Sequence, residues 1–430
     1  MMEQQDHEMK TFFQSNTAKM MMVGFLTLVL LIPLFFVQDL ITERSQRKQE
    51  VITETTSKWG GEVFCYGPML KVPYYDNTTK QLQTAYFFPD KLTTASEVKM
   101  ARTLKRSIYK ANVFSAAITF EGQFATPDFS ALSIPAENIH WEETQIVFQT
   151  TNINSINSEV KVNVNGQKIA FEPVASSKPN DTIATLESGR FPATQLAGKT
   201  FKMQLNYNGS HAISFVPVGK STKATLHSDW HSPSFSGYFL PSTQNASSNG
   251  FQATWQVQHF NRPFNQQQFG PLPDLSKYAY KVDLITPVDE YQQNERASKY
   301  GFLVIGLTFL VFFLIQTLSK INIHIFQYSM IGIALVLFYA LLISITEHSS
   351  FTLAYAIAGT AIVSMITLYA YSILQNRKFP LLIGGALSLI YAFLFVIIQL
   401  EDYALLVGSV GLFAILAAVM FFSRKIDWSK

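Results

Sequence analysis

Five long apolar stretches towards the C-terminus dominate the pattern of hydrophobic and polar positions. A helix that crosses the hydrocarbon core of a bilayer needs about 20 predominantly apolar residues. Each stretch is close to that length, none contains Asp, Glu, Lys or Arg, and short polar turns separate them. The stretches are Tyr300–Leu318, Tyr328–Ile345, Phe351–Ile373, Phe379–Leu400 and Tyr403–Phe422. The pattern predicts a five-helix transmembrane domain over residues 300–422.

A sixth apolar run lies near the N-terminus. Met20–Val37 is longer than the apolar region of a signal peptide, and no small-x-small cleavage site follows it. It therefore predicts an uncleaved transmembrane helix over residues 20–37, behind a polar tail of residues 1–19. The next segment, Gln38–Lys58, contains no Pro or Gly and is rich in charged and amide residues. We expect the first helix to continue through it and to stop at Gly60-Gly61.

The residues between the first and second predicted spans have the pattern of a β-rich domain. Apolar and polar residues alternate there, and Asn165-Gly166 and Asn208-Gly209 each separate two alternating runs. Asn-Gly favours two-residue hairpin turns because both central positions adopt positive φ. We expect hairpins over Lys161–Phe171 and Met203–Phe215, within a mostly antiparallel, sandwich-like β domain of residues 38–299.

The basic residues predict how six spans are oriented. Six spans place both termini on one side, and Lys and Arg favour the cytoplasmic side of short loops. The two short turns on the other side, Thr346–Ser350 and Glu401–Asp402, contain neither. The basic residues on the side of the termini are Lys10, Lys19, Lys320, Arg377, Lys378, Arg424, Lys425 and Lys430. We expect cytoplasmic termini, including a tail of residues 423–430, and an exported domain of residues 38–299.

Charged residues also flank spans one and two on the exported side. The basic residues among them oppose the predicted orientation of the spans. They carry less weight because a domain this long is translocated largely regardless of its charges. We interpret most of them, together with one acidic residue, as a charged collar that fixes the exported domain on the membrane. The members of this predicted collar are Arg44, Arg47, Asp289, Arg296 and Lys299.

Two acidic turns form a second group of candidate functional residues. Glu347-His348 and Glu401-Asp402 lie at the exported boundary of the bilayer, between spans that the short turns make antiparallel neighbours. Charges at this boundary cost far less than charges at mid-membrane. In one interpretation the four residues mark helix ends and topology. In the other they form a ring that docks the exported domain, binds a cation or responds to pH.

His227, Asp229 and His231 form a third candidate group. On an extended strand the three side chains share one face, and two His with a carboxylate are plausible ligands of a zinc ion with an open position. Cβ atoms about 7 Å apart along one strand converge poorly on one ion. The alternative interpretation is a packed turn around Trp230 with polar neighbours, and we assign no metal ligand.

The composition excludes several further classes of protein. The net charge is only +3 and no Lys/Arg-rich run is present, which argues against nucleic-acid binding. Cys65 is the only cysteine, so an intramolecular disulfide is impossible, and we expect a small buried hydrophobic residue. No acidic or basic residue lies inside the spans, which argues against an ion-coupled transporter. Nucleotide-binding and hydrolase motifs are also absent, so we expect no catalytic residue and no cofactor.

Several multi-residue motifs, in order along most of the chain, resemble the CreD family of bacterial inner-membrane proteins. The chain departs from that family's pattern at Gln316 and Ile325, where the family has Glu and Pro. The motifs that carry the resemblance include Ile41-Thr-Glu43-Arg44-x-x-Arg47, Trp59-Gly60, Gly67-Pro68-x-Leu70-x-x-Pro73, Ser228-x-Trp230-x-x-Pro233-Ser234-Phe235-x-Gly237, Pro287-Val-Asp289-x-Tyr291, Arg296-Ala-x-Lys299-Tyr300, Glu347-His348 and Gln399-Leu-Glu401-Asp402-Tyr403.

The resemblance implies a multi-pass protein of the inner membrane of Gram-negative bacteria, with a periplasmic domain and a role in the response to envelope stress. We expect a non-enzymatic protein that maintains cell envelope integrity. Its partners would be membrane lipids and an envelope component that the sequence does not identify. Two alternatives stay open: a transporter or flippase of a lipid or lipid-linked precursor, and a periplasmic metal-dependent hydrolase that uses His227, Asp229 and His231.

Overall fold

The structure of the chain is a computed structural model. It describes residues 16–106, 109–130, 134–175, 182–193, 198, 200–284, 290–319, 321, 323–374, 378–400 and 403–424. The chain divides into two compact units. The helical unit consists of Met1–Lys48 and Val288–Lys430, and the β unit of Gln49–Pro287.

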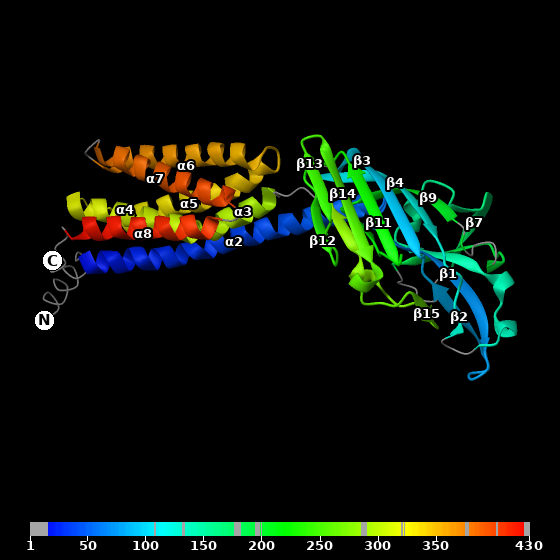
Figure 1. Cartoon of the computed structure of the whole chain (residues 1–430). Helices are drawn as coiled ribbons and strands as arrows, with labels where there is room; N and C mark the ends of the chain where they lie inside the picture. The colour runs from blue at the N-terminus through cyan, green and yellow to red at the C-terminus, as the bar shows by residue number, and fades with distance from the viewer. Residues whose placement is uncertain are drawn as a thin grey trace. The chain divides into compact units, whose positions relative to one another are not determined.

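Long helices make up the helical unit (Figure 1). Five of the described helices (α2 and α5 to α8) are long and apolar enough to cross a membrane, and α4 gives a sixth span when it is taken together with α3, from which it is bent by 43°. The predicted class, a membrane protein with one N-terminal and several C-terminal spans, is confirmed. The helices are α2 (Asn16–Ser57), α3 (Glu290–Lys299), α4 (Gly301–Ser319), α5 (Ile325–Thr346), α6 (Phe351–Ile373), α7 (Lys378–Gln399) and α8 (Ala404–Ser423).

Helix α2 continues past its apolar half, as the sequence predicts. It runs for 42 residues with Pro33 inside it, and only its last turns, from Gln49, belong to the β unit. The amides of Trp59 and Gly60 donate to the carbonyl oxygen of Thr56, which closes the final turn. Because residues 38–58 include no Pro or Gly, the helix continues without interruption past the end of its apolar half.

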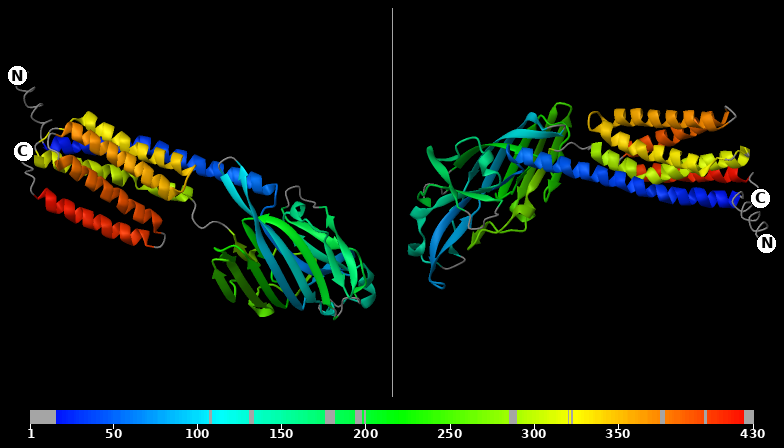
Figure 2. Two further views of the ribbon diagram at one scale, coloured as in Figure 1. Left: turned by 90° about the horizontal axis from the view of Figure 1, so that it is seen from above. Right: turned by 180° about the vertical axis from the view of Figure 1, so that it is seen from behind.

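The helices of the helical unit run side by side (Figure 2). They pack closely at glycines. A Cβ atom on Gly332 of α5 would lie 2.1 Å from Cδ1 of Leu30 in α2. One on Gly411 of α8 would lie 2.0 Å from the ring of Phe393 in α7. Small residues at such contacts let neighbouring helices approach within van der Waals distance, which is the main source of helix association in lipid.

The β unit is built on one continuous sheet. The strands follow the order β12-β16-β10-β1-β5-β8-β7-β6-β9-β4-β3-β11-β14-β13, with β2 paired to β1 and β15 to β2. The strands are β1 (Val63–Asp76), β2 (Gln81–Phe87), β3 (Lys91–Arg106), β4 (Tyr109–Gln123), β5 (Gln145–Thr150), β6 (Lys161–Val164), β7 (Gln167–Val174), β8 (Ala184–Ser188), β9 (Thr200–Ser210), β10 (Ala212–Phe215), β11 (Ser221–Ser228), β12 (Ser234–Gly237), β13 (Thr243–Ser247), β14 (Gly250–Gln258), β15 (Gln267–Phe269) and β16 (Tyr280–Asp283).

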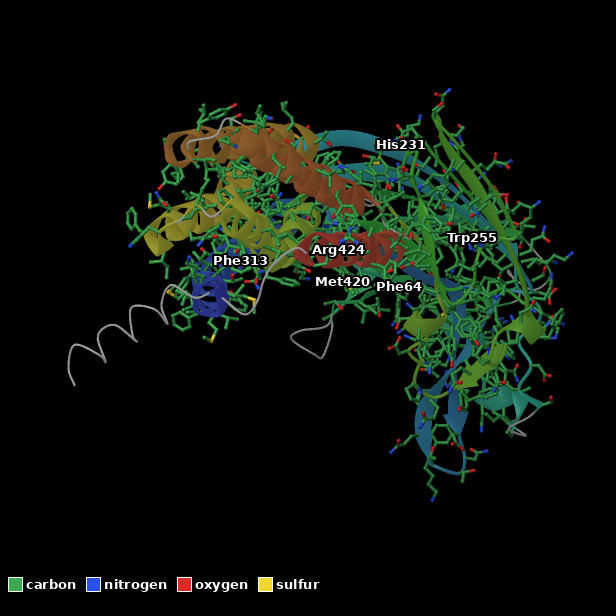
Figure 3. The ribbon with its side chains drawn as sticks, turned by 90° about the vertical axis from the view of Figure 1, so that its left-hand side faces the viewer. Phe64, His231, Trp255, Phe313, Met420 and Arg424 are labelled. Carbon is green, nitrogen blue, oxygen red and sulfur yellow. The ribbon has the colours of Figure 1, made fainter. Side chains whose placement is uncertain are left out.

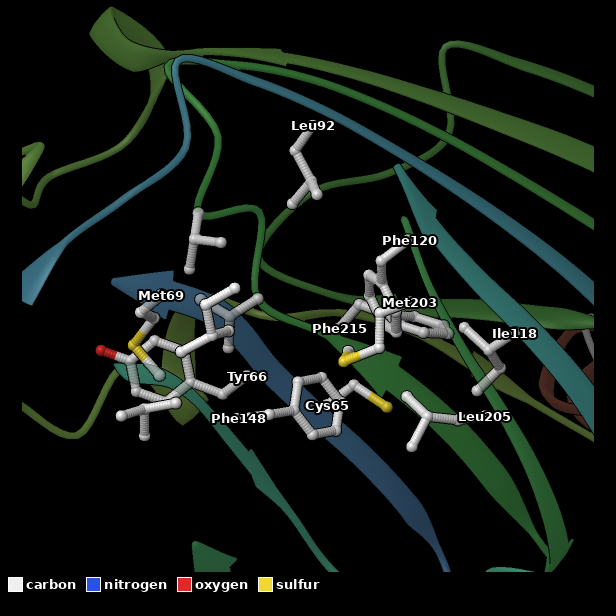
Figure 4. Packing of buried hydrophobic residues seen from close by; sticks show 14 of the residues in the cluster. Cys65, Tyr66, Met69, Leu92, Ile118, Phe120, Phe148, Met203, Leu205 and Phe215 are labelled. Atoms are coloured by element: carbon white, nitrogen blue, oxygen red, sulfur yellow. The ribbon is translucent and has the colours of Figure 1, made fainter. Parts of the chain in front are cut away.

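The two halves of this sheet face each other across one hydrophobic core. Strand β7 joins them, because its first residues pair with β6 and its last residues pair with β8. Phe120 of β4 packs against Phe148 of β5 and Phe215 of β10, with ring centroids 5.4 and 6.3 Å apart (Figure 4). The predicted sandwich-like arrangement is therefore made by one folded sheet.

A second aromatic group continues this core. Trp255 of β14 lies 4.9 Å from Tyr280 of β16 and 5.9 Å from Phe235 of β12, between ring centroids. Figure 3 shows Trp255 among the strands of the β unit. The terminal strand β12 thus packs over β14, which lies near the other end of the strand order.

One of the two predicted hairpins is confirmed. Strands β6 and β7 pair as an antiparallel hairpin with Val164 opposite Gln167. Asn165 and Gly166 form its turn at φ values of 52° and 90°, the positive range that Asn-Gly favours.

The second predicted hairpin is wrong. Asn208 and Gly209 lie inside β9 and pair with Ser115 and Phe114 of β4. The chain turns later, at His211, whose φ is 65°, and the following β10 pairs with β1 and β16 rather than with β9. Gly209 is required for packing, since a Cβ atom there would lie 2.5 Å from Cζ of Phe114.

Candidate functional site

Among the described residues, the candidate site with the most side-chain contacts lies in the helical unit, where α2, α3 and α5 come together. Glu347 caps the C-terminal end of α5, and its side chain is 15% exposed. A carboxylate at a helix C-terminus is unfavourable, because the unpaired carbonyl groups there carry partial negative charge. Arg44 of α2 compensates for it, with its Nε 3.9 Å from Oε1 of Glu347. The pair is the first polar contact of the site.

Tyr291 of α3 makes the second contact with the same carboxylate. Its hydroxyl donates to Oε1 of Glu347 at 3.4 Å, and its ring lies 5.0 Å below the ammonium group of Lys48. Glu347 thus receives a cation from α2 and a hydroxyl from α3. We call Arg44, Lys48, Tyr291 and Glu347 the buttress site.

The polar face of α3 explains how Tyr291 is positioned. Tyr291, Asn294 and Ser298 are buried and recur at intervals of three and four residues, which is one face of a helix. Gln38 of α2 donates to the carbonyl oxygen of Ser298 at 3.0 Å and so covers the end of α3. Asn294 Nδ2 donates to the carbonyl oxygen of Glu290 at 2.8 Å, while its buried Oδ1 accepts from no described residue.

The structure brings together only part of the predicted site residues. Arg44 and Glu347 are paired, whereas the exposed Arg296 forms no ion pair with a described residue. Lys299, also exposed, pairs within its own helix with Glu295, 2.7 Å away. The side chain of His348 is exposed, and its amide donates to the carbonyl oxygen of Ile345. The remaining predicted positions, Asp289, Glu401 and Asp402, lie outside the described residues.

The sequence analysis missed Tyr291 and Lys48 as site residues. Tyr291 appeared there only as part of a motif of the family resemblance. A signal was nevertheless present, because Tyr291 is the only aromatic residue in the polar segment Glu290–Lys299. Its spacing to Asn294 and Ser298 could have marked the buried face of a short helix.

The proposed zinc ligands are not gathered around one point. His227 Nδ1 lies 3.1 Å from Oε1 of Glu97, and Asp229 Oδ1 accepts from the amide of Met100 at 2.9 Å. His231 packs against Trp230, with ring centroids 5.1 Å apart. Among the described residues, no group of three His, Cys, Asp or Glu side chains is placed to hold a metal ion. The structure therefore supports the packed-turn interpretation of this segment.

The core of the helical unit contains three buried hydroxyl groups without a described partner. They belong to Thr308 of α4, Tyr339 of α5 and Tyr391 of α7. Tyr355 of α6 differs, since its hydroxyl donates to the carbonyl oxygen of Tyr391 at 2.9 Å. Phe338 packs between these rings, 5.3 Å from Tyr355 and 4.7 Å from Tyr391.

Solved structures give only weak likenesses. A protein of Legionella pneumophila subsp. pneumophila str. Philadelphia 1 is 12% identical, with a TM-score of 0.27 over 58% of this chain and 78% of that chain. An M1 zinc metallopeptidase from Deinococcus radiodurans is 9% identical, with a TM-score of 0.20 over 78% of this chain and 90% of that chain. Neither carries an argument about the fold or function of this chain.

Sequence comparisons extend over nearly the whole chain. The model of the family described as inner membrane protein CreD matches residues 15–429. The inner membrane protein CreD of Escherichia coli (strain K12) is 30% identical over 416 residues, which cover 93% of this chain and 91% of that protein. With its apolar helices and large β unit, the chain belongs to the CreD family of inner membrane proteins.

Proposed function

We propose that this inner-membrane protein maintains the cell envelope under stress without catalysing a reaction. In this proposal the termini are cytoplasmic, residues 38–299 are periplasmic, and the β unit binds an envelope component. The family membership supports a place in the envelope. The contact with an envelope component rests on one feature of the β unit, its exposed terminal strand.

Strand β13 ends the strand order of the sheet, and all five of its residues are exposed. An unpaired sheet edge presents N–H and C=O groups to any extended chain, and proteins usually protect such edges with Lys, other charges or Pro. The β13 sequence, Thr-Gln-Asn-Ala-Ser, contains none of these. It matches a surface that accepts an added strand from a partner protein.

Large apolar side chains lie just before this strand. Tyr238 is 53% exposed and Leu240 is 67% exposed. Side chains of this size at the start of an open edge would give affinity and specificity to backbone pairing. We call Tyr238, Leu240 and β13 the edge surface.

The edge surface can be tested in cells that lack the native protein. The variant carries Gln244→Lys and Ala246→Lys, which place two charges on the exposed edge. We expect normal accumulation and an unchanged Tm of the purified protein, but loss of the tolerance to a cell-wall-active antibiotic that the wild-type chain restores. Full tolerance with this variant would reject the edge surface, and unchanged tolerance of the deletion strain itself would reject the envelope role.

A photo-crosslinking residue identifies the component directly. Placed at Asn245 of β13, it would capture a specific partner in living cells. The control position is Gln204, which is also exposed and uncharged but lies on β9 and pairs with Thr119 of β4 on one side and Lys161 of β6 on the other. A band present at position 245 and absent at position 204 supports the proposal, whereas identical patterns contradict it.

One observation favours a second candidate function, the movement of a lipid or lipid-linked precursor. The hydroxyl groups of Thr308, Tyr339 and Tyr391, which have no partner among the described residues, are free to bind polar groups of such a molecule. The close helix contacts at Gly332 and Gly411 favour a permanently packed bundle instead. If Tyr339→Phe and Tyr391→Phe together leave stress tolerance unchanged, the transport alternative loses its support.

A further inference from the structure

Arg262 is a buried charged residue in a surface segment of the β unit. The segment connects β14 to β15 and begins with the short 3-10 helix η6 (His259–Asn261). Its other residues are largely exposed, including Phe260 at 75%, whereas Arg262 is 5% exposed. The guanidinium is therefore turned inward beneath a thin layer of chain.

Among the described residues, the hydrogen-bond partners of the guanidinium are neutral. It donates from Nη1 to the carbonyl oxygen of Phe264 at 3.3 Å and from Nη2 to Oε1 of Gln266. Its Cζ lies 4.3 Å from the ring centroid of Phe264 and 6.0 Å from that of Phe88. Nε is buried without a hydrogen-bond partner, and no described carboxylate pairs with the side chain. Since an uncompensated buried charge is strongly unfavourable, this arrangement calls for an anion.

Tyr66 of β1 offers a second unpartnered donor beside the same aromatic ring. It is 1% exposed, its hydroxyl has no hydrogen-bond partner in the described part of the chain, and its ring centroid lies 6.3 Å from that of Phe88. Burial raises the pKa of Tyr66, so the hydroxyl keeps its proton. Burial lowers the pKa of Arg262 to about 10, which still leaves the guanidinium charged at neutral pH. Both groups are therefore hydrogen-bond donors under physiological conditions.

Asp274 is the acidic residue that influences Tyr66 most strongly, but it is engaged elsewhere. Its Oδ1 accepts from the amide of Ser276 at 2.9 Å. The hydrogen bonds from Ser276 and the nearby charge of Lys277 lower the pKa of Asp274. Asp274 is thus stabilised by its own turn and does not act as the counter-ion of Arg262.

We propose that Nε of Arg262 and the hydroxyl of Tyr66 form a binding site for an oxyanion, the carboxylate or phosphate group of a small solute or of a lipid headgroup. Charged hydrogen bonds of this kind are stronger than neutral ones and suit the planar guanidinium. This site is independent of the edge surface and of the role in envelope maintenance.

The test measures thermal unfolding of the purified full-length chain in detergent at constant ionic strength. The probes are inorganic phosphate, acetate and short-chain phosphatidylglycerol, each titrated with NaCl as the balancing salt. We expect a saturable rise in Tm, because a ligand that binds only the folded state stabilises it. A response to phosphate or acetate identifies a soluble anion, and a response to the lipid alone identifies a headgroup. Both support the site.

Three variants decide whether the response comes from this site. Tyr66→Phe removes one hydroxyl and is expected to weaken binding about tenfold, and Arg262→Gln to abolish it. Arg190→Gln is the control, since Arg190 belongs to the same unit and its side chain is 66% exposed. The absence of a saturable response in the wild type would overturn the proposal. So would an unchanged affinity of Tyr66→Phe, which keeps the test valid even if Arg262→Gln does not fold.

Discussion

Nε of Arg44 lies 3.9 Å from Oε1 of Glu347 and joins α2 to the end of α5. The two residues are 303 positions apart in the sequence. Because Tyr291 donates to the same oxygen atom, one carboxylate connects three helices that no hydrophobic pattern could have paired. The contact is polar and lies at helix ends, where directional bonds fix orientation more than they add stability.

A double-mutant cycle on this pair measures its contribution. Arg44→Met and Glu347→Gln each remove one charge, and the Arg44 side chain is 48% exposed, so solvent screens the interaction. We expect a coupling energy of up to about 1 kcal/mol, measured by thermal unfolding of the single and double variants in detergent. Strictly additive effects would show that the pair is not coupled. The exposed pair of Lys299 and Glu295, treated in the same way, is the control and is expected to couple less.

Replacing Gly209 by alanine tests why it lies in a strand. A Cβ atom at this position would lie 2.5 Å from Cζ of Phe114 and 2.8 Å from Cγ2 of Val63. We expect Gly209→Ala to lower the free energy of unfolding by about 1–3 kcal/mol, the usual cost of overpacking a core. The measurement is the Tm of the purified protein.

The matched control is Gly166→Ala in the confirmed hairpin. There a Cβ atom meets nothing within 4 Å, and only the φ of 90° opposes the substitution. Its cost is expected to be backbone strain of about 1 kcal/mol. Adding Phe114→Leu to Gly209→Ala makes room for the methyl group, so the double variant is expected to lose less than the sum of the two single losses. An additive loss would mean that Phe114 does not cause the defect.

These two glycines show how far the sequence predicts the fold. Asn165-Gly166 was predictable because a two-residue turn is a local structure that these two residue types alone favour. Asn208-Gly209 has the same letters, but its structure depends on Phe114, a residue about 95 positions away in the chain. Likewise, no local pattern indicates that β1 pairs with β10 and β3 with β11 in parallel. Such pairings are set by packing between distant segments.

The candidate site was predictable to a similar extent. Glu347 was a candidate because a charge at the end of an apolar span is conspicuous in sequence. Its partners were not predictable, since Arg44 is one of several basic residues near the first span. Tyr291 looks in sequence like an ordinary interfacial aromatic residue. Arg44 and Tyr291 become the partners of Glu347 because α2 and α3 pack beside the end of α5.

Cys65 is expected to be unreactive in the folded protein. Cys65 is 1% exposed in the core of the β unit (Figure 4), and burial raises the pKa of its thiol well above the ordinary value. Because the thiolate is the reactive form, a thiol reagent should label the native protein only as it unfolds. Labelling rates with increasing denaturant would then follow the unfolding of the β unit. Rapid labelling without denaturant would contradict the buried position of Cys65.

His211 is expected to make the β unit less stable in mild acid. Burial lowers the pKa of His211, the nearby carboxylate of Glu62 raises it, and the ammonium of Lys281 lowers it, with burial the largest effect. The folded state therefore binds fewer protons than the unfolded state between this lowered pKa and about 6.5. It follows that the contribution of His211 to stability is full above pH 6.5 and is lost as the pH falls through this window.

The substitution His211→Asn removes the titration, and Asn tolerates the φ of 65° at this position. We expect the Tm difference between pH 7.5 and pH 5.5 to be smaller in His211→Asn than in the wild type, with the exposed His259→Asn behaving as wild type. An equal difference in all three proteins would assign the acid sensitivity to other groups.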